Sequence, residues 1–342
     1  MSARGTAPRN ATVRDVARVA GVSPATVSNV LSNHPRVATA TRERVRAAMT
    51  ELGYQPNPLA RSLRSGRSGS IALVLPGLRN AYFAELATEV INAASRHHLS
   101  VSIEILDGDR DTEIAALRGP RTAFVDGIIY VPSALSGLEI DEHVKPGMPM
   151  VLLGERGLGS SLSRVDYRNV EASKAATAHL LAQGCRRIVA VGPHERAGSA
   201  TPRLEGYQQA HQDAGIAIDP NLEVDVTAWH RAQGSEAIED LLARGVAFDG
   251  VFAFNDMLAL GAMRALADAG INVPHDVRVI GFDALEESAY SLPSLSTIDP
   301  GKQAAARLAV YMLVAALASD SADQVIGEAE FALVERASSA AR

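Results

Sequence analysis

Residues 12–32 read TVRDVARVAGVSPATVSNVLS and decide how the chain begins to fold. Apolar side chains recur there at spacings of three and four residues, which predicts a short amphipathic helix. This apolar stripe consists of Val13, Val16, Ala17 and Ala20. Thr12 is a good N-cap for the helix, and Gly21 supplies the tight turn that follows it.

A second helix is predicted to begin at Ser23 and Pro24. The serine side chain can cap the helix, and proline loses no hydrogen bond at the first helical position. Val27, Val30 and Leu31 would face back onto the first helix. Two short helices joined by a glycine turn form a helix-turn-helix. A third helix follows in residues 41–54, with an apolar stripe and a stop at Gly53.

The charge of the chain divides sharply near this region. Residues 1–69 contain eleven arginines, no lysine and three acids, a net charge of +8. The remainder therefore carries −14, because the whole chain carries −6. A basic N-terminal region (residues 1–69, here called the head) followed by an acidic remainder (residues 70–342, the body) is typical of a polyanion-binding module joined to another domain. A solvated basic tail is the alternative, and the helical signals within the head argue against it.

The second helix would expose short polar side chains between arginine-rich flanks. Thr26, Ser28 and Asn29 are the residue types that contact phosphates and base edges in a major groove. A purely structural three-helix bundle would have no need of them. We therefore expect the head to bind double-stranded DNA.

Residues 54–70 read YQPNPLARSLRSGRSGS and predict a hinge. The two prolines break the preceding helix, and the Gly/Ser-rich end is typical of a linker. Between them, PLARSLR is long enough for one and a half helical turns, which is marginal for a helix alone in water. We expect this helix to form only when two copies pack together on DNA.

From about Thr12 to Ser338 the chain resembles the lactose-repressor (LacI/GalR) family. The resemblance rests on the stretch already quoted and on VATATRERVRAAMTELGYQPNPLARSLRSGRS, which a strand then follows. It implies that the second helix, Pro24 to Leu31, reads the major groove and that a hinge helix, Asn57 to Arg64, lies in the minor groove. Leu63 would wedge into the central base step, at the cost of unstacking it.

The DNA contacts that this resemblance implies are made by Thr12, Ser23, Pro24, Ala25, Thr26, Ser28, Asn29, Asn57, Ala60 and Leu63. Pro24 and Ala25 can offer only apolar contact, for instance to a thymine methyl group. Asn29 is the best candidate for a specific contact, because asparagine pairs bidentately with adenine. Two heads reading two half-sites require a homodimer and a pseudo-palindromic operator. The chain ends at FALVERASSAAR without a leucine heptad, which favours a dimer over a tetramer.

The body alternates strands and helices from Ile71 onwards. Short apolar runs lie at 71–76, 101–106, 127–132 and 150–154, and the pattern restarts with runs at 187–192, 222–226, 250–255 and 277–283. Two sets of such units predict two doubly wound parallel sheets. By resemblance they form the two lobes of one sensor domain, like that of periplasmic sugar-binding proteins, with the chain crossing between the lobes.

Ligands in such sheets bind beyond the carboxyl ends of the strands. The residues that follow the strands here are polar or aromatic: Asn80, Tyr82, Phe83, Asp107, Asp109, Asn255, Asp256 and Asp283. Arg203 opens a helix, and Trp229 could stack on a sugar face. By resemblance, Arg203, Asn255 and Asp283 match effector-contacting residues, Trp229 matches a pocket tryptophan, and Phe83 falls in an aromatic region of the first lobe. The predicted effector contacts are Asn80, Phe83, Arg203, Trp229, Asn255 and Asp283.

These residues could also have purely structural roles that involve no ligand. Arg203 could cap a helix or pair on the surface, Trp229 could be plain packing, and Asp256 is best explained as an N-cap. The co-occurrence of hydrogen-bonding groups with an aromatic platform nevertheless favours a polyhydroxylated ligand such as a sugar.

The expected organisation is a disordered tail over 1–11, a DNA-binding domain over 12–56, a hinge helix and linker over 57–70, and a two-lobed effector-binding and dimerisation domain over 71–342. No membrane span, secretion signal or cofactor is expected, and Cys185 as the only cysteine excludes an internal disulfide. Enzyme motifs such as G-x-G-x-x-G and G-x-S-x-G are missing after the strands. We expect a cytoplasmic repressor controlled by its effector, rather than an enzyme or a solute-binding protein of transport.

Overall fold

The computed structural model describes residues 11–31, 34–54, 67–118, 125–192, 198–319 and 323–340. The chain divides into two compact units, Met1–Ser68 and Gly69–Arg342. The expected hinge helix, with Asn57, Ala60 and Leu63, lies outside the described residues, as does almost all of the expected N-terminal tail. Within the described ranges, no helix is both long and apolar enough to cross a membrane.

In its described residues, the first unit contains three helices, α1 (Val13–Ala20), α2 (Pro24–Leu31) and α3 (Thr39–Glu51). The predicted caps are confirmed: Thr12 and Asp15 form a capping box on α1, and Ser23 Oγ accepts a hydrogen bond from the Thr26 amide at 3.1 Å. Gly21 has a φ of 63°, a left-handed conformation that glycine adopts without strain. The small core is formed by Val16, Ala17, Ala20, Val27, Val30, Val45 and Ala48.

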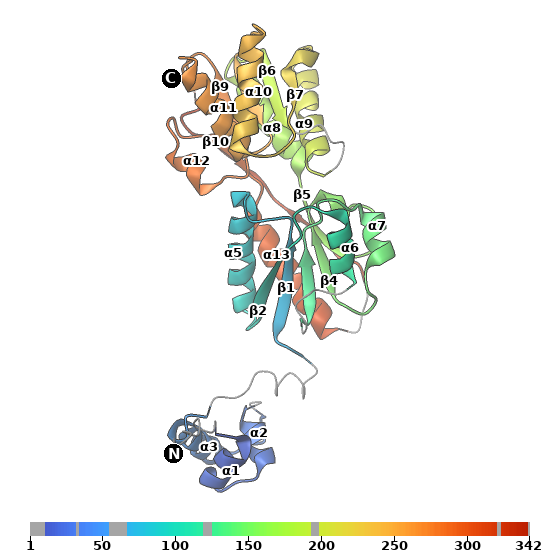
Figure 1. Ribbon diagram of the computed structural model, residues 1–342, viewed down its shortest axis with the longest axis vertical. Coiled ribbons are helices and arrows are strands. Elements are labelled where there is room, and N and C mark those ends of the chain that lie inside the picture. The colour runs from blue at the N-terminus through green and yellow to red at the C-terminus, as the bar shows by residue number, and fades with distance from the viewer. Residues whose placement is uncertain are drawn as a thin grey trace, which may run out of the picture. The chain divides into compact units, whose positions relative to one another are not determined.

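The second unit contains two lobes, each built on a six-stranded sheet (Figure 1). The sheet of the first lobe has the strand order β11-β5-β4-β3-β1-β2. Its strands are β1 (Ser70–Leu75), β2 (Ser100–Ile105), β3 (Gly127–Tyr130), β4 (Met150–Leu153), β5 (Ser163–Tyr167) and β11 (Ile326–Ala329). All its pairings are parallel, as the apolar runs predicted.

Helices cover both faces of this first sheet. On one face, α5 (Ala81–Ser95) and α13 (Lys302–Ala318) bury Leu86, Val90 and Val310 against alternate residues of the strands. On the other face, α6 (Arg110–Leu117) and α7 (Gly137–His143) bury Leu117 and Ile140. This places the strand ends, and the short helix η1 (Glu155–Gly157), at one edge of the lobe.

The sheet of the second lobe has the order β12-β10-β9-β8-β6-β7. Its strands are β6 (Ile188–Gly192), β7 (Glu223–Asp225), β8 (Gly250–Ala253), β9 (Arg278–Phe282), β10 (Ser296–Asp299) and β12 (Ala332–Val334). The edge strand β12 runs antiparallel to β10, so the sheet is mixed at that edge.

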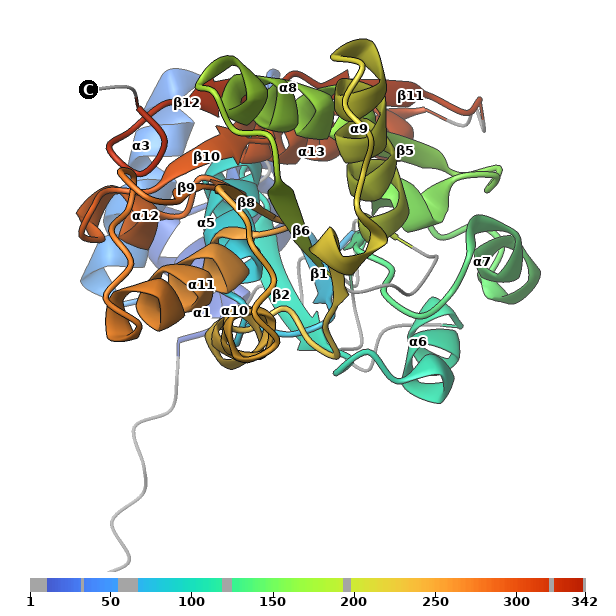
Figure 2. The ribbon, with the colours of Figure 1, turned by 90° about the horizontal axis from the view of Figure 1, so that it is seen from above.

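Helices also cover both faces of the second sheet, as Figure 2 shows. On one side lie α8 (Asn169–Ala182) and α9 (Ala200–Asp213), and on the other lie α10 (Arg231–Ala243) and α11 (Asp256–Asp268). The short helices η2 (Pro220–Leu222) and α12 (Glu286–Tyr290) complete the lobe. The predicted doubly wound architecture is therefore confirmed for both lobes.

The chain passes between the lobes three times. It leaves the first lobe after β5, returns after β10 to form α13 and β11, and crosses back to form β12. The crossing itself was predicted, but no pattern in the sequence assigned α13 and β11 to the first lobe. Three connecting segments thus join the lobes at one edge.

Candidate functional site

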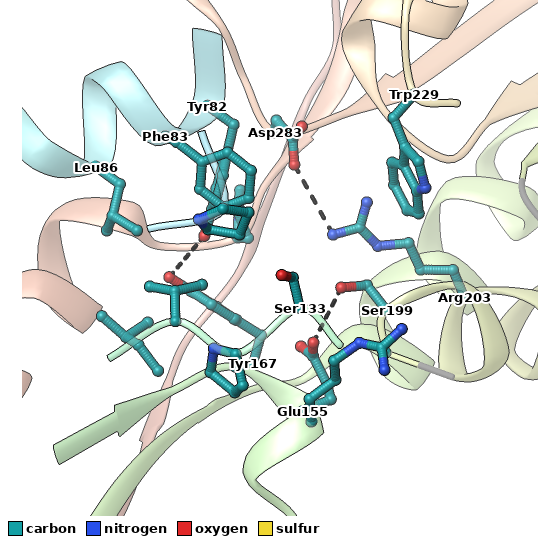
Figure 3. Close-up of a pocket in the computed structure, with 18 residues that line it drawn as sticks. Tyr82, Phe83, Leu86, Ser133, Glu155, Tyr167, Ser199, Arg203, Trp229 and Asp283 are labelled. Atoms are coloured by element: carbon teal, nitrogen blue, oxygen red, sulfur yellow. Dashed lines mark hydrogen bonds and ion pairs between the residues drawn. The ribbon is translucent and has the colours of Figure 1, made fainter. Parts of the chain in front are cut away.

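A cavity of about 280 Å³ lies within the second unit, at the carboxyl ends of the strands of both lobes (Figure 3). The first lobe contributes Pro76, Tyr82, Phe83, Leu86, Val131, Pro132, Ser133, Leu153, Gly154, Glu155, Arg156 and Tyr167. The second lobe and the segment that leaves it contribute Gly198, Ser199, Arg203, Trp229, Asp283 and Pro300. The volume lies just below the usual range of roughly 300–1,000 Å³ for small-molecule pockets, so the cavity fits a small ligand.

Arg203 lies in the first turn of α9 and is 6% exposed. Its Nε donates to Asn169 Oδ1 at 2.9 Å, and its Nη1 donates to the carbonyl oxygen of Phe254. The guanidinium stacks on the Phe282 ring, 3.6 Å from the ring centroid. These contacts fix the plane of the guanidinium, whose second terminal nitrogen, Nη2, lies 3.8 Å from Asp283 Oδ1. The alternative of a surface arginine is wrong.

Asp283 follows β9 and is 4% exposed. Its φ is 111°, in the left-handed region, and that of Ala284 is 48°. Among the described residues, no donor lies within hydrogen-bonding distance of the Asp283 carboxylate; the nearest cation is Arg203. Burial raises the pKa of this carboxyl to about 7, and the Arg203 charge opposes the rise. A buried carboxylate without a donor is ready to accept hydrogen bonds from a ligand.

Glu155 links the two lobes across the cavity. It begins η1 in the first lobe, and its Oε2 accepts a hydrogen bond from Ser199 Oγ of the second lobe at 3.0 Å. Its Oε1 accepts from Asn169 Nδ2, and Asn169 also holds Arg203. Burial raises the pKa of the Glu155 carboxyl, and the Arg203 charge opposes this shift.

Aromatic rings form much of the remaining wall. Tyr82 Oη donates to Tyr167 Oη at 2.8 Å, and the Tyr82 and Phe83 rings meet edge to face with centroids 5.3 Å apart. On the opposite lobe, the Trp229 ring centroid lies 5.3 Å from Arg203 Cζ. In Figure 3 these rings flank the polar groups from two sides. The cavity therefore offers apolar faces and a few fixed polar groups, which is typical of small-molecule binding sites.

Four of the six predicted effector contacts, Phe83, Arg203, Trp229 and Asp283, line this cavity. Asn80 and Asn255 do not. Asn80 is the N-cap of α5 and accepts from the Tyr82 amide at 3.0 Å. Asn255 is the N-cap of α11, and its Nδ2 donates to the Trp229 carbonyl oxygen at 3.2 Å. Both asparagines therefore position a residue of the wall.

Asp256 was expected to cap α11, and this prediction is wrong because Asn255 takes that position. The Asp256 side chain is fully buried and accepts hydrogen bonds from the Leu285 amide, Ser288 Oγ and Thr297 Oγ1. Burial raises its pKa to about 6, against the effect of these donors. Asp256 thus anchors the segment that follows Asp283.

Sequence reasoning missed several residues of the wall, among them Ser133, Glu155, Tyr167 and Ser199. The signal was available for three of them, since Ser133 follows β3, Glu155 follows β4 and Tyr167 ends β5. The rule that ligands bind at strand ends applies to these strands as it does to β1, β8 and β9.

Ser133 is held by a buried glutamate. Glu113 of α6 is 1% exposed and accepts from the amides of Ser133, Ala134 and Leu135 at 3.0, 3.0 and 3.2 Å. It also accepts from Tyr130 Oη at 2.6 Å and from Ser133 Oγ. Five donors on one carboxylate fix the loop after β3.

The predicted DNA contacts that are described lie at the start of α1 and along α2. Thr12, Ser23, Pro24, Ala25 and Asn29 are exposed, whereas Thr26 and Ser28 are half-buried. Ser23 Oγ lies 2.9 Å from Thr26 Oγ1, so these two hydroxyls are linked at the helix start. The apolar residues Val27 and Val30 face the core, as predicted.

Comparison with known proteins adds independent findings. The family described as "Bacterial regulatory proteins, lacI family" matches residues 12–57, and a periplasmic binding protein-like domain matches residues 177–339. The ribose operon repressor of Halalkalibacterium halodurans is 34% identical over 84% of this chain and 85% of its own. The transcriptional regulator GntR of Pseudomonas aeruginosa is 35% identical over 96% and 95% of the two chains.

Solved structures agree with these matches. A LacI-family regulator from Sanguibacter keddieii superposes with a TM-score of 0.75 at 41% identity, covering 81% of this chain and all of that one. The complex of the transcriptional regulator CelR with cellobiose superposes with a TM-score of 0.69 at 28% identity, covering 96% and 99% of the two chains.

Proposed function

Because the chain belongs to the lacI family of bacterial regulatory proteins, it is a DNA-binding transcriptional regulator, and we propose that its effector is a neutral, hydroxyl-rich molecule of monosaccharide size. The observation that carries this proposal is the Asp283 carboxylate, which is buried in the cavity wall and accepts no hydrogen bond from any residue that the structure describes. Sugar hydroxyls would supply the missing donors.

The charges around the cavity favour a neutral ligand. Two carboxylates, Asp283 and Glu155, line the wall together with Arg203 and Arg156. Arg203 already has Asp283 as its counter-charge, so a carboxylate or phosphate on the ligand would compete with Asp283 and suffer its repulsion. Trp229 and Phe83, on opposite lobes, offer ring faces to the apolar faces of a sugar. The ribose operon repressor and the cellobiose complex support a sugar, and the volume of about 280 Å³ favours one ring over two.

We propose that the DNA-binding species is a homodimer on a pseudo-palindromic operator. Two exposed apolar groups in the second unit suit a second copy of the chain. One lies on α5 and the edge strand β2, and the other lies at and after α12: Ile91, Ile103, Ile105, Tyr290 and Leu292. The Glu286 amide donates to Glu85 at 3.0 Å, so α12 lies against α5 and the two groups belong to neighbouring elements. Tyr290 and Leu292 are 79% and 97% exposed, which is costly unless they are covered.

Control of DNA binding would then be a population shift. Effector bound between the lobes changes how the lobes sit against each other, and the dimer transmits this change to the two heads. A ligand shifts the operator-competent state only by its differential affinity for the two states. Release of DNA on binding is the direction we propose, as expected of a repressor controlled by an inducer.

The test begins with selection of a bound sequence from random double-stranded DNA, followed by titration of the full chain at several salt concentrations. Operator affinity is then measured with D-ribose, D-glucose, cellobiose, D-gluconate and D-ribose 5-phosphate. We expect a neutral monosaccharide to lower the affinity at least fivefold, the lower end of ordinary allosteric couplings. Asp283→Asn, which keeps the shape of the side chain, should lose most of this response.

A response to only gluconate or the phosphate ester would refute the neutral-ligand proposal, and a response to only cellobiose would refute the size argument. A tetramer mass in sedimentation at low micromolar concentration would refute the dimer. Failure to prefer any palindromic fragment in a salt-sensitive manner would refute the proposed mode of operator recognition.

A further inference from the structure

A buried lysine joins the two lobes behind the cavity. Lys302 is the first residue of α13, which packs in the core of the first lobe, and it is 8% exposed. Its Nζ lies 2.8 Å from Glu85 Oε2 on α5 of the first lobe. The same nitrogen donates to the carbonyl oxygen of Ala284 at 3.2 Å and to that of Asp283, both in the second lobe. An ammonium group has three donors, and here all three are used.

The segment that Lys302 holds is a strained one. Asp283 and Ala284 both have positive φ angles although neither is glycine, and such conformations persist only where the surroundings fix them. Within the second lobe, Thr297 Oγ1 accepts from the Ala284 amide at 3.2 Å and Asp256 accepts from the Leu285 amide at 2.8 Å. The Asp283 amide also donates to the carbonyl oxygen of Ile298 at 2.8 Å, again within the second lobe. Lys302 and Glu85 add contacts from the first lobe.

Glu85 completes this arrangement. One of its carboxylate oxygens pairs with Lys302, and the other accepts a hydrogen bond from the Glu286 amide at 3.0 Å. Glu85 also lies on α5 one turn after Tyr82, a residue of the cavity wall, and Lys302 Nζ lies 5.9 Å from the Tyr82 ring centroid. Lys302 therefore contacts wall residues of both lobes, although it does not line the cavity itself.

We infer that Lys302 is a positioning residue for the cavity and that, together with Glu85, it couples the two lobes. By holding the backbone at Asp283 and Ala284 it aims the Asp283 carboxylate into the cavity, and through Glu85 it ties that segment to α5. The coupling role rests on the proposed function, because it requires that Asp283 receive the effector. A shift of this segment on binding is then passed directly to the first lobe.

Amide hydrogen exchange in the full chain, without added ligand, tests the positioning role. In Lys302→Met we expect the amides of Ala284 to Glu286 to exchange about tenfold faster, since two charge-assisted hydrogen bonds to this segment are lost. Glu85→Gln keeps an acceptor, so its effect should be smaller and confined to Glu286. Lys174→Met is the matched control, because the Lys174–Asp213 ion pair at 2.6 Å lies within the second lobe. Faster exchange at the start of α13 alone would overturn the inference.

Operator binding tests the coupling role. The response, taken as the ratio of operator affinities without and with sugar, should fall at least fivefold in Lys302→Met for whichever of D-ribose and D-glucose acts more strongly on the wild type. Lys302→Arg, which keeps the charge and several donors, should restore part of the response. An unchanged response in Lys302→Met would overturn the coupling. If neither sugar acts on the wild type, the proposed effector class is wrong, and the exchange result still decides the positioning role.

Discussion

The Arg203 guanidinium and the Asp283 carboxylate face each other across 3.8 Å in the wall of the cavity, and both side chains are more than nine-tenths buried. This distance is too long for a hydrogen bond and short enough for a strong charge interaction. The pair is therefore only partly satisfied within the protein. Ligand hydroxyls can complete it, because they donate to one partner and accept from the other.

Removing the cation of this pair should weaken both stability and binding. Arg203→Met leaves Asp283 and Glu155 without their nearest buried cation, and we expect a loss of about 3 kcal/mol in the free energy of unfolding, measured in urea. Arg203→Lys should not restore the response to sugar, because lysine lacks the planar fork that reaches Asn169, Phe254 and Asp283 together. Arg264→Met, which breaks only an exposed pair with Asp268, should leave the urea midpoint unchanged. Equal effects of the two methionine variants would contradict this prediction.

The pH dependence of stability should reveal Asp283. Its folded pKa of about 7 lies above the ordinary value of 3.8, so the folded state binds a proton in the window between them. The contribution of this proton binding to the free energy of unfolding is full below about pH 4 and is lost as the pH rises through 7. We expect the contribution of Asp283 to the free energy of unfolding to rise by roughly 1 kcal/mol per pH unit as the pH falls through this window. Asp283→Asn should reduce the measured pH dependence without abolishing it, because the raised pKa of Asp256, about 6, contributes in the same direction. An identical pH dependence in the variant would be inconsistent with a raised pKa of Asp283.

The buried glutamate under the cavity should matter for both folding and binding. Glu113→Ala leaves five donors without their acceptor, and we expect a loss of about 3 kcal/mol in the free energy of unfolding. Sugar binding measured by calorimetry should weaken as well, since the loop that carries Ser133 loses its anchor. Tyr130→Phe removes one donor and keeps the carboxylate, so a cost of about 1 kcal/mol is expected. A larger cost for Tyr130→Phe than for Glu113→Ala would refute the role given to the carboxylate.

On the DNA side, Asn29→Ala should weaken binding to the selected operator by about 1–3 kcal/mol and relax the preference at one base position. The physical reason is the loss of a bidentate contact with adenine from the exposed side chain. A repeated selection with the variant measures the preference, and thermal unfolding run in parallel checks that the head remains folded. An unchanged base preference would show that Asn29 does not read the sequence.

Much of the fold could be predicted because local physics dictates it. Thr12 and Ser23 cap helices, Gly21 ends one and Pro24 begins one. Each does so through its own side chain or backbone conformation, so these roles follow from the sequence alone. The apolar runs predict the buried strands just as directly. The placement of α13 and β11 in the first lobe could not be read in this way, because their apolar residues would fit either lobe and only tertiary packing decides between them.

The candidate site was predicted in part for a similar reason. The ends of the buried strands are visible in the sequence as the points where apolar runs stop. The positions of Phe83 and Asp283 near the cavity could therefore be predicted. The adjacent residues Asn255 and Asp256 were assigned their roles from residue type alone. In the structure, Asn255 caps α11, and the buried Asp256 carboxylate accepts three hydrogen bonds. Lys302 gave no signal at all, because its three acceptors come from parts of the chain far away in sequence.

The chain has a single tryptophan, and it stands in the cavity wall beside Arg203. Indole emission is sensitive to nearby charge and to water, so any molecule that enters the cavity should change the colour or brightness of the protein's own fluorescence. Occupancy could therefore be followed optically in the unlabelled chain, without a background from other indoles.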